Sequence, residues 1–280
     1  MAVNDATTIR RALAQASLAP LDAQVILAHV LGRDRAWLLA HATEPLPPAD
    51  ADAFFNLAAR RRSGEPIAYL TGRREFWGLA LAVDVSVLIP RPETETLVEC
   101  ALRRLPIDRA LRVLDLGTGS GAIALALAHE RPRATIVATD ISEAALEIAR
   151  QNAEQLGLRN VEFARSDWYA SDTGALAGLF DAIVSNPPYV PAGDPHLAEG
   201  DVRHEPLFAL TSGRDGLDAL RTIVADAGKH LVPGGSLVVE HGYDQATAVR
   251  ALLEQAGFAD LEFLRDLSGI SRVAAGRASA

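Results

Sequence analysis

The spacing of apolar residues changes character about a quarter of the way along the chain. Up to residue 73 they recur at the three- and four-residue intervals of amphipathic helices. In segment 21–32, Gly32 is a helix stop, and one face is formed by Leu21, Val25, Ala28 and Leu31. A second helix is predicted within 45–66, ending at Ser63 and Gly64. We therefore predict a small helical domain over residues 1–73.

The rest of the chain shows a different pattern. Residues 74–91 alternate apolar and polar positions around Gly78, which indicates a hairpin or linker. From residue 110 onward, strand-like and helix-like segments alternate; strands are predicted at 111–117, 134–140, 161–167, 180–186 and 234–242, helices at 121–130, 142–157, 217–231 and 245–257, and a last strand-like stretch at 261–276. This order predicts an α/β domain over residues 92–280, with a mostly parallel sheet covered by helices on both faces.

Charge and composition narrow the class of protein. The first 85 residues carry nine arginines and nine acidic residues, so the net charge of −9 falls on the remainder and disfavours broad nucleic-acid binding. No apolar stretch reaches the roughly 18 residues of a membrane span, and no basic-then-apolar leader opens the chain. We expect a cytoplasmic protein without membrane association. The seven histidines are scattered, and no metal site is predicted.

The segment "VLDLGTGSG" places three glycines between a predicted strand and a predicted helix: Gly117, Gly119 and Gly121. Alone, such a turn indicates only a tight connection. The next strand, however, ends in Asp140, 19 residues after Gly121. A carboxylate there can accept both ribose hydroxyls of a nucleotide-like cofactor, and ligands of such sheets bind beyond the strands' carboxyl ends. Dinucleotides and S-adenosylmethionine both fit this pattern.

Neighbouring residues favour S-adenosylmethionine. The third glycine comes one place earlier than in the dinucleotide fingerprint G-x-G-x-x-G. Asp115, if it points into the site, would repel a pyrophosphate but suit ammonium and sulfonium charges. After the third strand, Asp167 can accept from an adenine amino group. Trp168 can cover the adenine ring, although simple core packing explains it as well.

The segment "NPPY", Asn186 to Tyr189, directly follows the predicted strand "FDAIV". Proline cannot continue a sheet ladder, so the strand must end at Asn186. The side-chain oxygen of Asn186 and the carbonyl of Pro187 can each accept an N–H from a planar NH₂ group, which turns its lone pair toward a methyl donor. Pro188 stiffens the segment and Tyr189 can pack on the planar group. The alternative is a capped loop without chemistry.

The order of elements and the glycine turn resemble class I S-adenosylmethionine-dependent methyltransferases. NPPY resembles their amino-methylating branch, which includes adenine-N6 DNA methyltransferases and protein glutamine methyltransferases. Several segments together resemble the HemK/PrmC family of release-factor glutamine methyltransferases: "GEPIAYLTGRREFWGLALAV" (64–83), "VLIPRPETETLVE" (87–99), "DLGTGSGAIALALA" (115–128), "SNPPYV", "EPLFAL" and "GRDGL". The resemblance runs from about Gly64 to the C-terminus.

The resemblance implies methylation of the side-chain amide of the glutamine in the GGQ motif of class 1 peptide-chain release factors, which modulates translation termination. It implies cofactor contacts from Gly117, Thr118, Gly119, Ser120, Gly121, Asp140, Trp168 and Asn186, alongside the predicted Asp167. It implies glutamine contacts from Asn186, Pro187, Pro188 and Tyr189, with the "IPRPETE" segment, including Arg91 and Glu93, lining the same cleft. We expect a monomer that contacts release factors and does not bind nucleic acid directly.

Two other functions are compatible with parts of this pattern. An adenine-N6 nucleic-acid methyltransferase also uses NPPY, but it needs a basic groove, and the catalytic part is acidic. A binding module without activity would have lost cofactor residues, and none is missing. Five arginines cluster around the end of the helical domain: Arg60, Arg61, Arg62, Arg73 and Arg74. They form either a solvated basic face or a docking surface for a release factor.

Overall fold

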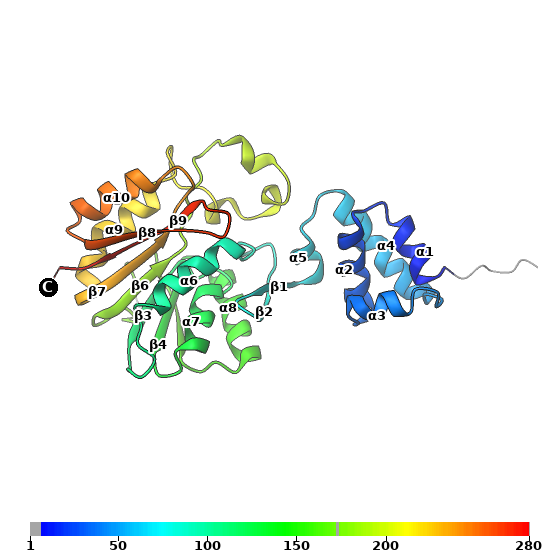
Figure 1. The fold of residues 1–280 in the computed structure, drawn as a ribbon, viewed down its shortest axis with the longest axis horizontal. Helices are drawn as coiled ribbons and strands as arrows, with labels where there is room; N and C mark the ends of the chain where they lie inside the picture. The colour runs from blue at the N-terminus through cyan, green and yellow to red at the C-terminus, as the bar shows by residue number, and fades with distance from the viewer. Residues whose placement is uncertain (1–6, 172–173, 280) are drawn as a thin grey trace, which may run out of the picture. The chain divides into compact units, whose positions relative to one another are not determined.

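The computed structural model describes residues 7–171 and 174–279. The chain forms two compact units, shown in Figure 1. The first comprises Met1–Arg73 and Ala198–His204, and the second comprises Arg74–Leu197 and Glu205–Ala280. Residues 1–6 and 280, at the ends of the domains expected from the sequence, lie outside the described residues.

The first unit is helical. Its helices are α1 (Ile9–Gln15), α2 (Pro20–Leu31), α3 (Arg35–Ala40), α4 (Pro48–Arg62) and α5 (Ile67–Thr71). Gly32 ends α2 in the left-handed conformation, with a φ of 60°, as the sequence predicts. The buried face of α2 differs from the predicted one: Leu21 is 52% exposed, whereas Ala23, Ile26 and Leu27 are buried. The helix is apolar around most of its circumference, so packing against α4 selects the face.

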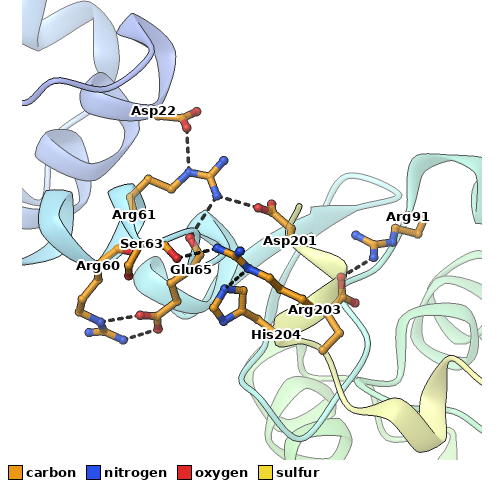
Figure 2. A network of polar contacts seen from close by, with 10 residues as sticks. Asp22, Arg60, Arg61, Ser63, Glu65, Arg91, Asp201, Arg203 and His204 are labelled. Atoms are coloured by element: carbon orange, nitrogen blue, oxygen red, sulfur yellow. Dashed lines mark hydrogen bonds and ion pairs between the residues drawn. The ribbon is translucent and has the colours of Figure 1, made fainter. Parts of the chain in front are cut away.

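Ion pairs and hydrogen bonds hold the segment Ala198–His204 in this unit (Figure 2). Arg61 on α4 pairs with Asp22 at 2.8 Å and with Asp201 at 2.7 Å. Arg203 donates to the backbone oxygen of Ser63 at 2.6 Å. A Cβ on Gly64 would lie 1.7 Å from Arg203 Nη2, so this approach requires glycine. The short segment comes from the loop after NPPY.

The arginine cluster is therefore not a uniformly solvated basic face. The Arg61 side chain is 21% exposed and lies between two carboxylates. Arg60 pairs with Glu65, and Arg62 donates to the backbone oxygen of Ala16 at 2.7 Å. Much of the positive charge of the cluster is compensated within the unit.

The second unit begins with a two-stranded sheet of β1 (Arg73–Phe76) and β2 (Leu79–Ala82), turning at Trp77 and Gly78. Both turn residues have positive φ, 54° and 70°. The 3-10 helix η1 (Pro92–Thr94) and α6 (Glu95–Leu102) follow.

Seven strands form the main sheet: β3 (Arg112–Leu116), β4 (Thr135–Asp140), β5 (Val161–Arg165), β6 (Phe180–Ser185), β7 (Leu231–Glu240), β8 (Ala259–Arg265) and β9 (Ser271–Arg277). Their order is β5-β4-β3-β6-β7-β9-β8, and β9 runs antiparallel to the other six strands. The predicted mostly parallel sheet is confirmed. The last strand-like stretch is instead a hairpin of two strands, because Asp266 accepts the backbone N–H groups of Ser268 and Ile270 and closes a turn.

Helices cover both faces of the sheet (Figure 1). The first face carries α6, α7 (Ala122–Glu130) and α8 (Glu143–Leu156), and the second carries α9 (Asp218–His230) and α10 (Ala246–Gln255). Val113 packs on the first face and its neighbour Leu114 on the second, as a strand buried on both sides requires. In residues 7–171 and 174–279, no helix has the length and apolar character needed to cross a bilayer.

The strand order reverses between β3 and β6. The chain proceeds from β3 outward to β4 and β5, and then returns to place β6 on the other side of β3. Loops that leave the carboxyl ends of β3 and β6 therefore diverge and open a crevice, which is where open α/β sheets bind ligands.

Asn152, on α8, links the hairpin to the glycine turn. Its side chain is fully buried, and its Nδ2 donates to the backbone oxygens of Ala82 at 3.0 Å and Ser120 at 2.9 Å. Its Oδ1 accepts the N–H of Ala82 at 2.6 Å. Three backbone groups are thus satisfied by one side chain.

Replacing Asn152 with leucine should leave those three groups without partners. Because an unpaired buried polar group costs roughly 1–3 kcal/mol, we expect Asn152→Leu to lower the free energy of unfolding by at least about 2 kcal/mol. Urea denaturation measures this loss. Gln151→Leu, at the exposed neighbouring position on the same helix, is the matched control. Equal stability of the two variants would contradict the role assigned to Asn152.

Candidate active site

A cavity of about 300 Å³ lies in the second unit, beyond the carboxyl ends of β3, β4 and β6. It brings together most of the residues that the sequence singles out: Arg91, Gly117, Thr118, Gly119, Ser120, Asp140, Asp167, Trp168, Asn186 and Pro188. Five other residues from that set do not line it: Glu93, Asp115, Gly121, Pro187 and Tyr189.

The glycine turn is held against the end of β4. The N–H groups of Gly117 and Thr118 both donate to the backbone oxygen of Thr139, at 2.9 and 2.8 Å. Gly121 begins α7 with a φ of 85°, and a Cβ there would lie 3.0 Å from Leu125 and 3.2 Å from Ala149. Gly121 therefore allows α7 and α8 to approach closely rather than forming the cavity wall.

Asp140, the last residue of β4, is oriented by the turn itself. Its Oδ2 accepts the N–H of Gly119 and its Oδ1 accepts the N–H of Ser142, each at 2.9 Å. Burial raises the pKa of this carboxyl, while those N–H groups lower it. Each oxygen keeps a further lone pair. The carboxylate can therefore accept hydroxyl groups from a ligand in the cavity without losing its support.

Asp115 does not line the cavity, contrary to its expected direction. It is fully buried behind the turn, and its Oδ2 accepts the hydroxyl of Thr118 at 2.7 Å. Its Oδ1 has no hydrogen-bond partner in the described chain. Burial, with a smaller contribution from the nearby Asp140, raises the pKa of Asp115 to about 7, although the Thr118 hydroxyl opposes this rise. One carboxyl in the cavity wall, Asp140, and one behind it, Asp115, favour a cationic ligand, because a nearby positive charge stabilises their ionised forms.

Trp168 both lines the cavity and packs against the core. It has a positive φ of 50°, and Ser166 donates to its backbone oxygen at 2.6 Å. A Cβ on Gly117 would lie 3.7 Å from the Trp168 ring, so the glycine keeps the space beside that ring open. Asp167, its neighbour, is exposed at the cavity edge.

The NPPY segment begins where β6 ends, as predicted. The Ser185 hydroxyl donates to the backbone oxygen of Leu116 at 2.7 Å, which fixes the end of β6 beside β3. Asn186 donates its Nδ2 to the Thr94 hydroxyl at 3.1 Å. No hydrogen bond reaches Asn186 Oδ1 from the described residues. This arrangement leaves the oxygen of Asn186 as the acceptor presented to the cavity.

Tyr189 is held from behind the cavity. Its hydroxyl donates to Glu240 Oε1 at 3.1 Å, and its backbone oxygen accepts from Gln245 Nε2 at 3.0 Å. Burial, with help from Glu240, raises the pKa of Tyr189 well above its usual value. The phenol is therefore neutral and donates its hydrogen bond at any ordinary pH.

Arg91 on the "IPRPETE" segment pairs with the buried Glu205 (Figure 2). The same carboxylate accepts the N–H of Ile89 at 3.2 Å. The charge of Arg91 is thus balanced within the unit, although its side chain still reaches the cavity wall. Glu93 is partly buried and lies outside the lining.

Several functional positions could not be assigned from the sequence. Thr94 and Phe208 line the cavity, and Glu240 lies behind it at the end of β7. Thr94 belongs to "IPRPETE" and Phe208 to "EPLFAL", so the motifs include these residues, but their side-chain types indicate no particular chemistry. In the segment "SLVVEHG", Glu240 follows a buried strand, as Asp140 does. This position at the end of a strand is the only sequence feature that indicates a role for Glu240.

The fold and the site define this protein as a methyltransferase. Residues 107–257 match a family described as "Methyltransferase domain", and residues 7–72 match "PrmC N-terminal domain". A solved methyltransferase from Pyrococcus furiosus shares the fold, with a TM-score of 0.56 and 19% identity over 80% of this chain and 99% of that chain.

Full-length relatives identify the family. The chain is 53% identical to the release factor glutamine methyltransferase of Xylella fastidiosa over 92% of each sequence. It is 52% identical to that of Bordetella pertussis, over 96% of this chain and 99% of the relative, and 48% identical to that of Escherichia coli, over 94% of each. The chain belongs to the release factor glutamine methyltransferases.

Proposed function

We propose that this protein transfers a methyl group from S-adenosylmethionine to the side-chain amide nitrogen of the glutamine in the GGQ motif of class 1 peptide-chain release factors, and so modulates translation termination. Family membership supports the reaction and the substrate. The observation that carries the chemistry is the orientation of Asn186, whose Nδ2 is engaged by Thr94 and whose Oδ1 remains an acceptor at the cavity.

The residues of the cavity fit S-adenosylmethionine. Asp140 offers lone pairs to ribose hydroxyls, Asp167 can accept from the adenine amino group, and Trp168 offers a ring face. The turn from Gly117 to Gly121 brings backbone close to the ligand, and Asp115 supplies negative charge behind it. When bound, S-adenosylmethionine supplies an electrophilic methyl group on a positively charged sulfur.

The glutamine side is formed by NPPY. An amide nitrogen is a poor nucleophile because its lone pair is delocalised into the carbonyl group. Asn186 Oδ1 and the Pro187 carbonyl can each accept one N–H, which orients the remaining lone pair toward the methyl group. Pro188 fixes the carbonyl direction, and Tyr189 stabilises the segment through Glu240. Arg91 borders this part of the site, and Glu93 lies on the same segment outside the cavity lining.

The proposed reaction leads to proposals for the macromolecular partner, the oligomeric state and the cellular compartment. We propose a release factor as the macromolecular substrate, a monomeric enzyme in the cytoplasm, and no direct contact with nucleic acid. The excess of acidic residues in the second unit supports the last point, since adenine-N6 methylation of nucleic acid needs a basic groove. The helical unit remains a candidate docking surface, with Arg60 and Arg62 as its more available charges because Arg61 is paired twice.

The ribose contact can be tested by substitution. Asp140→Ala removes charged hydrogen bonds worth roughly 1.5–3 kcal/mol, so cofactor affinity should fall by roughly one to two orders of magnitude. Asp167→Ala, at the exposed edge of the same cavity, should weaken binding less. Isothermal titration calorimetry with S-adenosylmethionine measures both. Unchanged affinity in Asp140→Ala would show that the ribose binds elsewhere.

The amide contact is tested by kinetics. Asn186→Ala deletes the Oδ1 acceptor, and loss of one preorganised hydrogen-bonding partner typically costs roughly 10²–10³ in rate. Single-turnover methylation of a release factor at saturating cofactor separates chemistry from binding. Asn186→Asp keeps an oxygen acceptor and should retain more activity than the alanine variant. A rate near wild type in Asn186→Ala would mean that NPPY is only a loop cap.

A further inference from the structure

Two buried polar side chains, Thr94 and Glu240, stand immediately behind the NPPY segment. Thr94 ends η1 and is 4% exposed, and Glu240 ends β7 and is 1% exposed. The sequence motifs do not predict a chemical role for either residue. Thr94 contacts Asn186, and Glu240 contacts Tyr189, so together they support the first and last side chains of NPPY.

The carboxylate of Glu240 is only partly satisfied. Its Oε1 accepts the Tyr189 hydroxyl, whereas its Oε2 has no partner in the described part of the chain. Burial raises the pKa of Glu240 to about 7, and the hydroxyls of Thr94 and Tyr189 oppose that effect. An ionised carboxylate in this position therefore has acceptor capacity left, and the influence of the Thr94 hydroxyl on the pKa of Glu240 places that hydroxyl beside the carboxylate.

The charged groups around Glu240 do not neutralise it. Arg272 on β9 lowers the pKa of Glu240 but is already paired with Asp266 at 3.2 Å. Glu93 on η1 raises it. His241, the next residue, is buried, and burial lowers its pKa, so the imidazole is neutral above pH 7. The hydroxyls of Thr94 and Tyr189 therefore favour the ionised form of Glu240 more than Arg272 does.

The hydrogens can be counted along this chain of groups. A threonine hydroxyl has one hydrogen to donate and two lone pairs that accept. Because Thr94 Oγ1 accepts from Asn186 Nδ2, its own hydrogen is left to point away from Asn186. The acceptor available behind it is the carboxylate of Glu240.

We propose that Glu240 is a positioning residue for methyl transfer: its carboxylate takes the Thr94 hydroxyl hydrogen, so that Thr94 accepts from Asn186 Nδ2 and Asn186 Oδ1 faces the substrate. The same carboxylate anchors Tyr189. This inference rests on the proposed function, because it concerns how Asn186 is oriented toward the glutamine amide.

The polarity of this chain depends on the protonation of Glu240. A protonated Glu240 can donate to Thr94, and Thr94 can then donate to the oxygen of Asn186 instead of accepting from its nitrogen. The Asn186 amide would turn over and present N–H groups, which cannot accept the hydrogens of the glutamine NH₂. Since the pKa of Glu240 is about 7, the productive orientation is favoured above pH 7 and lost as pH falls below it.

The kinetic test compares wild type, Glu240→Gln, Thr94→Val and Thr94→Ser across pH 6–8.5, with a full-length release factor and saturating cofactor. We expect wild-type kcat to fall as pH drops through about 7. Glu240→Gln should lose roughly tenfold in kcat at pH 8, less than for a group that touches the substrate directly. Its kcat should no longer change near pH 7, and its KM for the release factor should stay near the wild-type value.

Thr94 provides the matched pair. Thr94→Val removes the hydroxyl and should reproduce the kcat loss of Glu240→Gln, whereas Thr94→Ser keeps the hydroxyl and should retain the wild-type rate and pH profile. Because both groups act through one hydrogen-bond chain, the double variant Glu240→Gln/Thr94→Val should be no slower than Thr94→Val alone. Additive losses, or a wild-type pH profile in Glu240→Gln, would overturn the proposal.

A second measurement needs no substrate. The side-chain NH₂ group of Asn186 gives a pair of ¹H–¹⁵N signals, which are assigned by their absence in Asn186→Ala. In wild type these signals should shift with a midpoint near pH 7, and in Glu240→Gln they should not. Signals that do not change with pH, or that shift equally in both proteins, would contradict the inference. A shift that persists in Glu240→Gln would instead implicate Asp115, whose pKa is also about 7.

The two measurements separate this inference from the proposed function. If wild type fails to methylate the release factor while the Asn186 signals titrate through Glu240, the substrate is wrong and the positioning role stands. If wild type is active but Glu240→Gln matches it in rate, pH profile and NMR behaviour, the function stands and the positioning role is wrong.

Discussion

The hydrogen bond from Asn186 Nδ2 to Thr94 Oγ1 leaves the oxygen end of the Asn186 amide as the acceptor at the cavity. A side-chain amide has a donor end and an acceptor end of almost the same shape, so packing alone cannot choose between them. Only the acceptor end can hold an N–H of a glutamine amide. The proposed catalytic arrangement therefore needs a neighbour that accepts from the nitrogen, and Thr94 occupies that position.

Buried carboxyls give this site its electrostatic character. Asp115 and Glu240 are both buried, each has one oxygen without a hydrogen-bond partner among the described residues, and each has a pKa raised to about 7. Burying such groups costs stability, and a raised pKa means that each favours the folded state more at low pH than at high pH. Asp115 stands behind the proposed cofactor site and Glu240 behind the proposed glutamine site. Each of the two proposed sites therefore has a buried carboxyl behind it, and the charge of that carboxyl affects the electrostatic environment of the site.

Residues with local constraints were predictable from sequence, and those with distant partners were not. Proline chemistry placed the end of β6 correctly, and Gly32 ended α2 as expected. The role of Glu240 could not be predicted because its partner Tyr189 lies 51 residues away in the sequence. The position of the segment Ala198–His204 could not be predicted because Arg61 and Asp201 are 140 residues apart. The buried face of α2 was wrong because an almost wholly apolar helix fits several faces, and only its tertiary contacts select one.

The central claim, that the amide of one particular glutamine is the methyl acceptor, is tested most directly by mass spectrometry. A class 1 release factor is incubated with this protein and S-adenosylmethionine, digested, and sequenced by fragmentation. We expect a single added methyl group on the side chain of the GGQ glutamine, and none when that glutamine is replaced. A methyl group on another residue, on adenine in added nucleic acid, or nowhere would contradict it.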